Sequence, residues 1–289
     1  MPDNLSPAAA TWFALPDHAL LALEGPDSTA FAHAQFANDV AALAAGQWQW
    51  NAWLTPKGRV IALFALLKLA GDRLLLLLPD ADPPAMQEQL QRFVFRRKVQ
   101  VVRPSGLEVT ASFAAPVSAA GARIGLAGDA IELDYGDGNE ARSLRIAATT
   151  EAPAGTPEID RWRASDLRHG LPRLGPAQRE QWTPQQLSLE RLNAFSVKKG
   201  CYPGQEIVAR THFLGKAKRG LALFQADATV ASDADISDGQ QTLGKVLSVA
   251  EGKGSALLLA VLPSDRGTAT LYAEDVALRE LPLVDGLHR

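Results

Sequence analysis

Short apolar runs separated by polar breaks dominate the first hundred positions. The runs at Val60–Leu67 and Leu74–Leu78 are much shorter than the roughly 18 apolar residues of a membrane span, and they are typical of buried strands. Turn residues at Thr55–Gly58 and Gly71–Asp72 divide them and predict hairpins. The strands predicted in this half are Ala19–Leu23, Trp48–Leu54, Val60–Leu69 and Arg73–Leu78.

Helical spacing preceded by polar caps predicts helices between these strands. Asp27 caps a segment that extends to about Phe36, and Asp82, followed by proline, caps one that extends to about Arg97. A third helix is expected at Ile159–His169. Up to about Arg97, the predicted strands and helices form a lobe of the type strand, strand, helix.

The rest of the chain consists mainly of short strand-like segments between glycine-rich or polar turns. They are Leu107–Phe113, Ile131–Asp134, Ser143–Ile146, Leu221–Phe224, Lys245–Val249, Ala256–Val261 and a strand near Leu278–Leu281. The strands after Gly220 lie close together without helices between them, a pattern typical of a small β-barrel or sandwich.

Composition narrows the function classes. The chain has 289 residues, a net charge of −3 and one cysteine, which excludes an internal disulfide and an iron–sulfur cluster held by this chain alone. The N-terminus lacks the pattern of a secretory signal, so we expect a cytoplasmic protein. The acidic balance gives no general reason to expect nucleic-acid binding, although basic residues gather locally at Arg92–Arg103 and Lys198–Arg219.

The single cysteine, Cys201, lies in the most informative segment, Lys198–Arg210. We expect a strand at Asn193–Val197, a turn flanked by glycines, and a helix over Gln205–Leu214. Backbone N–H groups at a helix N-terminus and nearby lysines favour an anion, so the pattern predicts a thiolate with a lowered pKa. An inert buried cysteine is the alternative interpretation, since free cysteine is among the most buried residue types.

The segment Lys199–Glu206 resembles the KGCYxGQE signature of the YgfZ family, which comprises folate-binding relatives of the glycine-cleavage aminomethyltransferase. Earlier blocks, including Asn38–Val40 and Leu54–Arg59, are similar to the same family, whereas the similarity is patchy from 106 to 157 and weak after 223. The resemblance implies an α+β protein with two intertwined ferredoxin-like lobes around a central folate channel and a C-terminal β-barrel. It places the folate-binding region at 1–220, with the second lobe inserted at about 49–142, and the barrel at 221–289.

The resemblance also implies tetrahydrofolate, or a derivative of it, as cofactor. It further implies that the protein assists assembly, repair or protection of clusters in iron–sulfur enzymes, including those that modify tRNA. Cys201 and Lys199 are the candidate reactive residues, with no bound metal and at most a transient contact between Cys201 and iron. Aromatic rings for the pterin, cations for the glutamate tail and polar groups for the ring edge give the candidate folate ligands. These are Asn38, Asp39, Trp53, Arg59, Arg97, Trp182, Gly200, Tyr202, Gly204, Gln205, Glu206 and Arg210.

Two alternatives remain open at this stage. The aminomethyltransferase carries an acid where this chain has Pro83–Met86, which argues against classical turnover unless Asp82 takes that place. An aminomethyl or methyl transferase is therefore one alternative, and a folate-independent adaptor for RNA or protein is the other. We expect folate and iron–sulfur or cluster-assembly proteins as partners, with no membrane and no direct contact to nucleic acid.

Overall fold

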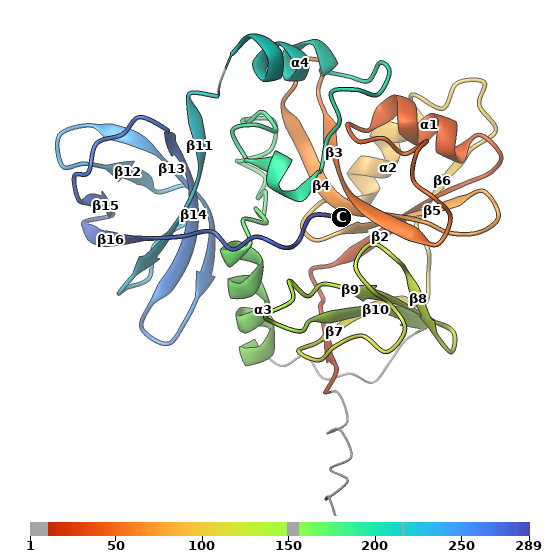
Figure 1. Ribbon diagram of the computed structural model, residues 1–289, viewed down its shortest axis with the longest axis horizontal. Helices are drawn as coiled ribbons and strands as arrows, with labels where there is room; N and C mark the ends of the chain where they lie inside the picture. Colours follow the sequence, from red (N-terminus) through yellow and green to blue (C-terminus); the bar gives the residue numbers. More distant parts are fainter. Residues whose placement is uncertain (1–10, 149–155, 216) are drawn as a thin grey trace, which may run out of the picture.

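The computed structural model describes residues 11–148, 156–215 and 217–289. Two five-stranded antiparallel sheets and a closed six-stranded barrel form its frame, with helices on the outside and along the centre (Figure 1). The expected α+β architecture with a C-terminal barrel is confirmed. No helix among the described residues is long and apolar enough to span a membrane.

The first sheet has the strand order β3-β4-β5-β2-β6, and both of its faces are buried. Along β4, Phe64 and Leu66 pack with the helices α1 and α2, whereas Leu63 and Ala65 pack toward the second sheet. Because a strand presents alternate residues to opposite faces, burial of both faces requires an unbroken apolar run. The elements are β2 (Ala19–Glu24), α1 (Ser28–Gln35), β3 (Gln47–Leu54), β4 (Val60–Lys68), β5 (Arg73–Leu78), α2 (Pro83–Gln91) and β6 (Gln100–Val102).

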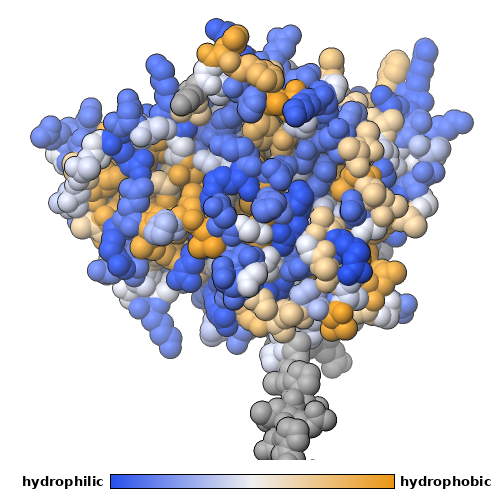
Figure 2. Space-filling model, viewed as in Figure 1, coloured by the Kyte–Doolittle hydropathy of each residue, from blue (hydrophilic) through white to orange (hydrophobic). Residues whose placement is uncertain are grey.

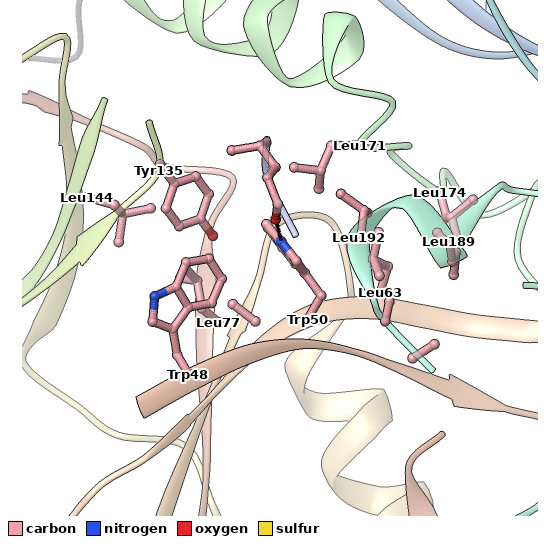
Figure 3. Packing of buried hydrophobic residues seen from close by; sticks show 14 of the residues in the cluster. Trp48, Trp50, Leu63, Leu77, Tyr135, Leu144, Leu171, Leu174, Leu189 and Leu192 are labelled. Atoms are coloured by element: carbon pink, nitrogen blue, oxygen red, sulfur yellow. Dashed lines mark hydrogen bonds between the residues drawn. The ribbon is translucent and has the colours of Figure 1, made fainter. Parts of the chain in front are cut away.

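The second sheet has the order β1-β7-β10-β9-β8 and shares its core with the first. Tyr135, which follows β9, stacks on Trp48 at 5.3 Å between ring centroids, and Trp50 meets the same tyrosine edge-on (Figure 3). Trp162 from α3 completes this aromatic group. The elements are β1 (Phe13–Ala14), β7 (Leu107–Ser112), β8 (Gly125–Ala127), β9 (Ala130–Asp134), β10 (Ser143–Ala148) and α3 (Thr156–Arg168).

The barrel has its own apolar interior, and the chain then returns to the centre of the molecule (Figure 1). Leu287 is buried there, and its carbonyl accepts a 2.7 Å hydrogen bond from Nε1 of Trp50. The strands are β11 (Arg219–Ala226), β12 (Asp235–Ser237), β13 (Thr242–Glu251), β14 (Ala256–Pro263), β15 (Leu271–Ala273) and β16 (Val276–Leu281).

The structure differs from the predicted elements at several points. Residues 193–197 form no strand; they follow a short 3₁₀ helix, η1 (Leu189–Leu192), and Asn193 adopts a left-handed conformation with φ 54°. The second helix ends at Gln91 rather than near Arg97. The short strands β6, β8, β12 and β15 have too few residues for a detectable alternation. The segment 49–142, expected to form one inserted lobe, contributes strands to both sheets.

Candidate functional site

Cys201 lies on an exposed turn directly before the helix α4 (Gln205–Leu214), at the top of the molecule in Figure 1. The expected helix begins and ends as predicted, with Gly204 before it and Gly215 after it. Residues 196–204, here called the cysteine loop, carry the thiol. The thiol is free and exposed, so the interpretation of Cys201 as a buried structural residue is wrong.

Lys199 anchors the beginning of the cysteine loop. Its side chain is buried, and its ammonium group donates hydrogen bonds to the backbone carbonyls of His33 and, at 2.6 Å, Phe36 at the end of α1. A cation at a helix C-terminus is also favoured by the helix dipole. Burial lowers the pKa of Lys199 to about 8, while the nearby Asp39 carboxylate opposes that shift. Lys199 therefore serves to hold the loop, and its ammonium group is committed to α1.

Three further members of the motif fix the other side of the loop. The Tyr202 hydroxyl donates to the Ser196 carbonyl at 3.1 Å, and the Gln205 amide donates to the Lys199 carbonyl at 3.1 Å. Gly204 has φ +81°, and a Cβ built there would lie 2.6 Å from Cα of Gly58. The helix α4 thus begins in direct backbone contact with the turn between β3 and β4.

These contacts give most of the motif a supporting role. Lys199, Tyr202, Gly204 and Gln205 were expected to react or to bind folate, but their groups are used within the protein. Gly200 has open space around it, so no close approach explains it. The result is a rigid loop with Cys201 exposed on it, an arrangement suited to presenting a thiol to another molecule.

The remaining motif candidates lie on the surface. Glu206 and Arg210 are exposed on α4. Phe213 and Leu214, at the end of the same helix, are also exposed. Figure 2 shows apolar surface at the top of the molecule, where α4 lies in Figure 1. Neither Glu206 nor Arg210 lines either of the two pockets beside the first sheet that are described next.

Two adjoining pockets lie away from the cysteine loop, beside the first sheet, and they share Ala81. One has a volume of about 390 Å³ and lies between α2 and residues 176–181. Its lining includes Trp53, Asp82, Met86 and Arg179. Trp53 is the only candidate folate ligand from the sequence that lines either pocket in the described part of the chain.

The second pocket, of about 460 Å³, lies between the first sheet, α3 and the barrel strand β13. Asp80, Arg173 and Gln178 bring a carboxyl, a guanidinium and an amide to it. Burial raises the pKa of Asp80 to about 6, against the opposing effect of the Arg173 guanidinium and a hydrogen bond from the Leu174 N–H. This carboxyl group therefore titrates close to neutral pH.

Arg173 belongs to a network of charges at the junction of both sheets and the barrel. Its guanidinium lies 3.2 Å from Asp166 and 3.5 Å from Asp17, and Asp166 also pairs with the fully buried Arg142 at 2.8 Å. Its backbone N–H donates to the Ser248 hydroxyl of β13 at 3.1 Å. The junction holds the pocket walls together, because a buried charge left without its partner is costly.

The other sequence candidates lie outside both pockets. The Asn38 side chain is buried and donates to the carbonyls of Trp50 at 2.9 Å and Asn193 at 2.5 Å. It therefore connects β3 of the first sheet with the residue that follows η1. Asp39 accepts from the Ala42 N–H. The Arg59 guanidinium donates to the Gln181 carbonyl.

Arg97 and Trp182 complete this group. Arg97 is exposed on the segment after α2, and the Trp182 indole N–H donates to the Gln178 side chain at 2.7 Å.

Asp80, Arg173, Gln178 and Arg179 were not expected to line a pocket. They lie in or beside loops without a motif, where hydrophobic periodicity carries no signal. The one available cue was a pair of carboxylates, Asp80 and Asp82, directly after the predicted strand Arg73–Leu78.

The fold is that of a glycine-cleavage aminomethyltransferase. The crystal structure of aminomethyltransferase T from Bartonella henselae superposes with a TM-score of 0.72 at 16% identity, over 96% of this chain and 87% of that one. At this identity the match establishes the fold alone.

Sequence relatives point to a particular branch of that fold. A tRNA-modifying protein YgfZ from Vibrio vulnificus is 25% identical over 276 residues, which cover 88% of this chain and 84% of the relative. The YgfZ of Photobacterium profundum is 32% identical over 118 residues, 38% of this chain and 36% of that protein. An uncharacterized protein of Haemophilus influenzae is 27% identical over 274 residues, which cover 88% of this chain and 89% of the relative. No family model matches the chain. The resemblance to YgfZ-type proteins, predicted from Lys199–Glu206, is confirmed.

Proposed function

We propose that this protein binds a tetrahydrofolate in the two adjoining pockets and presents Cys201 to iron–sulfur proteins, in support of tRNA modification. The observation that carries the proposal is the cysteine loop, in which the neighbouring motif side chains hold an exposed thiol in place. The names of the relatives supply the link to tRNA modification. A thiol presented in this way suits contact with iron, sulfide or a partner thiol.

The chemistry of the pocket linings fits a folate. Trp53 brings an aromatic ring for the pterin to the smaller pocket, and the Asp80 carboxylate in the adjoining pocket can accept from the N–H groups at the pterin edge. Arg179, which lines the smaller pocket, offers a cation for the glutamate tail. We therefore propose Arg179 for tail binding, in place of the candidates Arg59, Arg97 and Arg210.

Calorimetry with several reduced folates tests this assignment. A ligand that binds the native state raises its apparent stability, so wild type should show both heat and an increased Tm. Arg179→Met should weaken binding about tenfold, the loss expected when one charge-assisted hydrogen bond of roughly 1.5 kcal/mol is removed. Arg97→Met, on the exposed segment, is the matched control and should bind as wild type does. Equal losses in both variants, or no binding at millimolar folate, would overturn the folate site.

Cys201→Ala tests the second half of the proposal. Because the side chain is exposed, the variant should keep the Tm and folate affinity of wild type. In a strain lacking the protein it should fail to restore iron–sulfur enzyme activity and tRNA modification, whereas Lys198→Ala should restore both. Full restoration by Cys201→Ala would mean that the thiol has no part in the function.

A folate-dependent aminomethyl or methyl transferase is the second candidate, favoured by the fold and by Asp80. In the described structure the Asp82 carboxylate accepts from the Ala85 N–H at 3.3 Å as the cap of α2, so Asp80 replaces it as the candidate acid. A carboxyl with a pKa of about 6 is suited to proton transfer near neutral pH. Ammonia release from an aminomethylated carrier protein, lost in Asp80→Asn, would support turnover.

A further inference from the structure

The segment after α2, residues 92–98, exposes two aromatic side chains to solvent. Phe93 is 51% exposed and Phe95 is 87% exposed, whereas Val94 between them points into the core. An isolated exposed aromatic residue is ordinary, but two in three positions form an apolar surface that no described part of the chain covers. We call residues 92–98 the aromatic loop.

Four cations lie on the same segment as these rings. Arg92, Arg96, Arg97 and Lys98 are all exposed, and the Arg96 guanidinium carbon lies 5.4 Å from the centroid of the Phe95 ring. Arg92 pairs with Glu88 at 2.5 Å, and the other three cations make the loop strongly positive. The net charge of −3 for the whole chain gives no indication of this local excess of positive charge.

The loop is held firmly at its base. The Lys98 N–H donates to the Asp27 carboxylate at 2.7 Å, and the Asp27 N–H donates to the Lys98 carbonyl at 3.2 Å. The Arg97 N–H donates to the Val94 carbonyl at 2.9 Å. Phe95 has φ 46°, a left-handed conformation that is uncommon and strained for an aromatic residue. This backbone conformation directs a ring that fills no core position toward solvent, an arrangement suited to an external contact.

We propose that the aromatic loop binds a single-stranded segment of RNA. Unpaired bases stack on exposed aromatic faces and arginine planes, while neighbouring cations neutralise the phosphates. Phe95 with Arg96 beside it supplies the stacking surface, and Arg97 and Lys98 supply positive charge for the backbone. The choice of RNA over DNA rests on the proposed role in tRNA modification. The inference that the loop is a stacking surface is independent of that role. This proposal departs from the expectation, drawn from the whole sequence, of no direct contact with nucleic acid.

Fluorescence anisotropy with a labelled single-stranded RNA of roughly a dozen nucleotides tests the proposal. Phe95→Ala should weaken binding roughly 5- to 150-fold, the range measured for loss of one stacked base. Phe95→Tyr should retain most of the affinity because the stacking face remains. Phe213→Ala, which removes an exposed ring from α4, is the control and should bind as wild type does. The slope of log K against log salt should be about −1.4 if Arg97 and Lys98 both contact phosphates.

Three results would overturn the proposal. If Phe95→Ala has the Tm of wild type and binds RNA with unchanged affinity, Phe95 has no stacking role. Equal binding of single-stranded DNA of the same sequence would remove the choice of RNA. Sedimentation with anionic phosphatidylserine vesicles that depends on Phe95, without RNA binding, would make the loop a membrane contact. Because folate binding is measured separately by calorimetry, failure of the RNA proposal is distinguishable from failure of the proposed function.

Discussion

Alanine at Gly204 tests how the cysteine loop is held against the first sheet. The new Cβ would lie 2.6 Å from both Cα of Gly58 and the Thr55 carbonyl oxygen, so backbone must move to admit it. The φ of +81° adds the cost of a left-handed conformation. Strain of about 1–2 kcal/mol and overpacking of about 1–3 kcal/mol give a total loss of about 2–5 kcal/mol. With an unfolding entropy of about 2.1 cal/mol/K per residue, Tm should fall by roughly 3–8 °C.

Gly200→Ala is the matched control, because a Cβ at that position meets nothing within 4 Å. Differential scanning calorimetry should show a lower Tm for Gly204→Ala and no change for Gly200→Ala. The rate at which a maleimide labels Cys201 should change only in Gly204→Ala, where the loop is displaced. Equal Tm values for the two variants would refute the contact with Gly58 as the reason for glycine at 204.

Two further outcomes follow from buried titratable groups. Lys199→Met should lower the free energy of unfolding by about 1–3 kcal/mol in urea titrations, because the carbonyls at the end of α1 lose their donor, whereas the exposed Lys198→Met should have no effect. Asp80 has a folded pKa raised from 3.8 to about 6, so the native state binds the extra proton and stability falls as pH rises from about 4 to 6. Asp80→Asn should remove this part of the slope of Tm against pH; an unchanged slope would contradict the burial of the carboxyl.

The local pattern predicted most of the elements correctly, for identifiable reasons. The run Val60–Leu67 shows a strand buried on both faces, and Asp82 followed by proline marks the start of α2. The pattern was wrong at Asn193–Val197, because an apolar segment of five residues fits a strand and an irregular buried loop equally well. Contacts with the core decided between the two.

The sequence by itself determined the position of Cys201 before a helix, the resemblance carried by Lys199–Glu206, and the α+β architecture with its barrel. Only the tertiary structure decided what the motif side chains do. Lys199 meets the carbonyl of His33, which lies 166 positions away, and Gly204 meets Gly58. The pocket residues Asp80 and Gln178 are likewise brought together from distant segments. Periodicity and caps act over a few residues, so they determine elements; which distant group a side chain meets depends on how those elements pack.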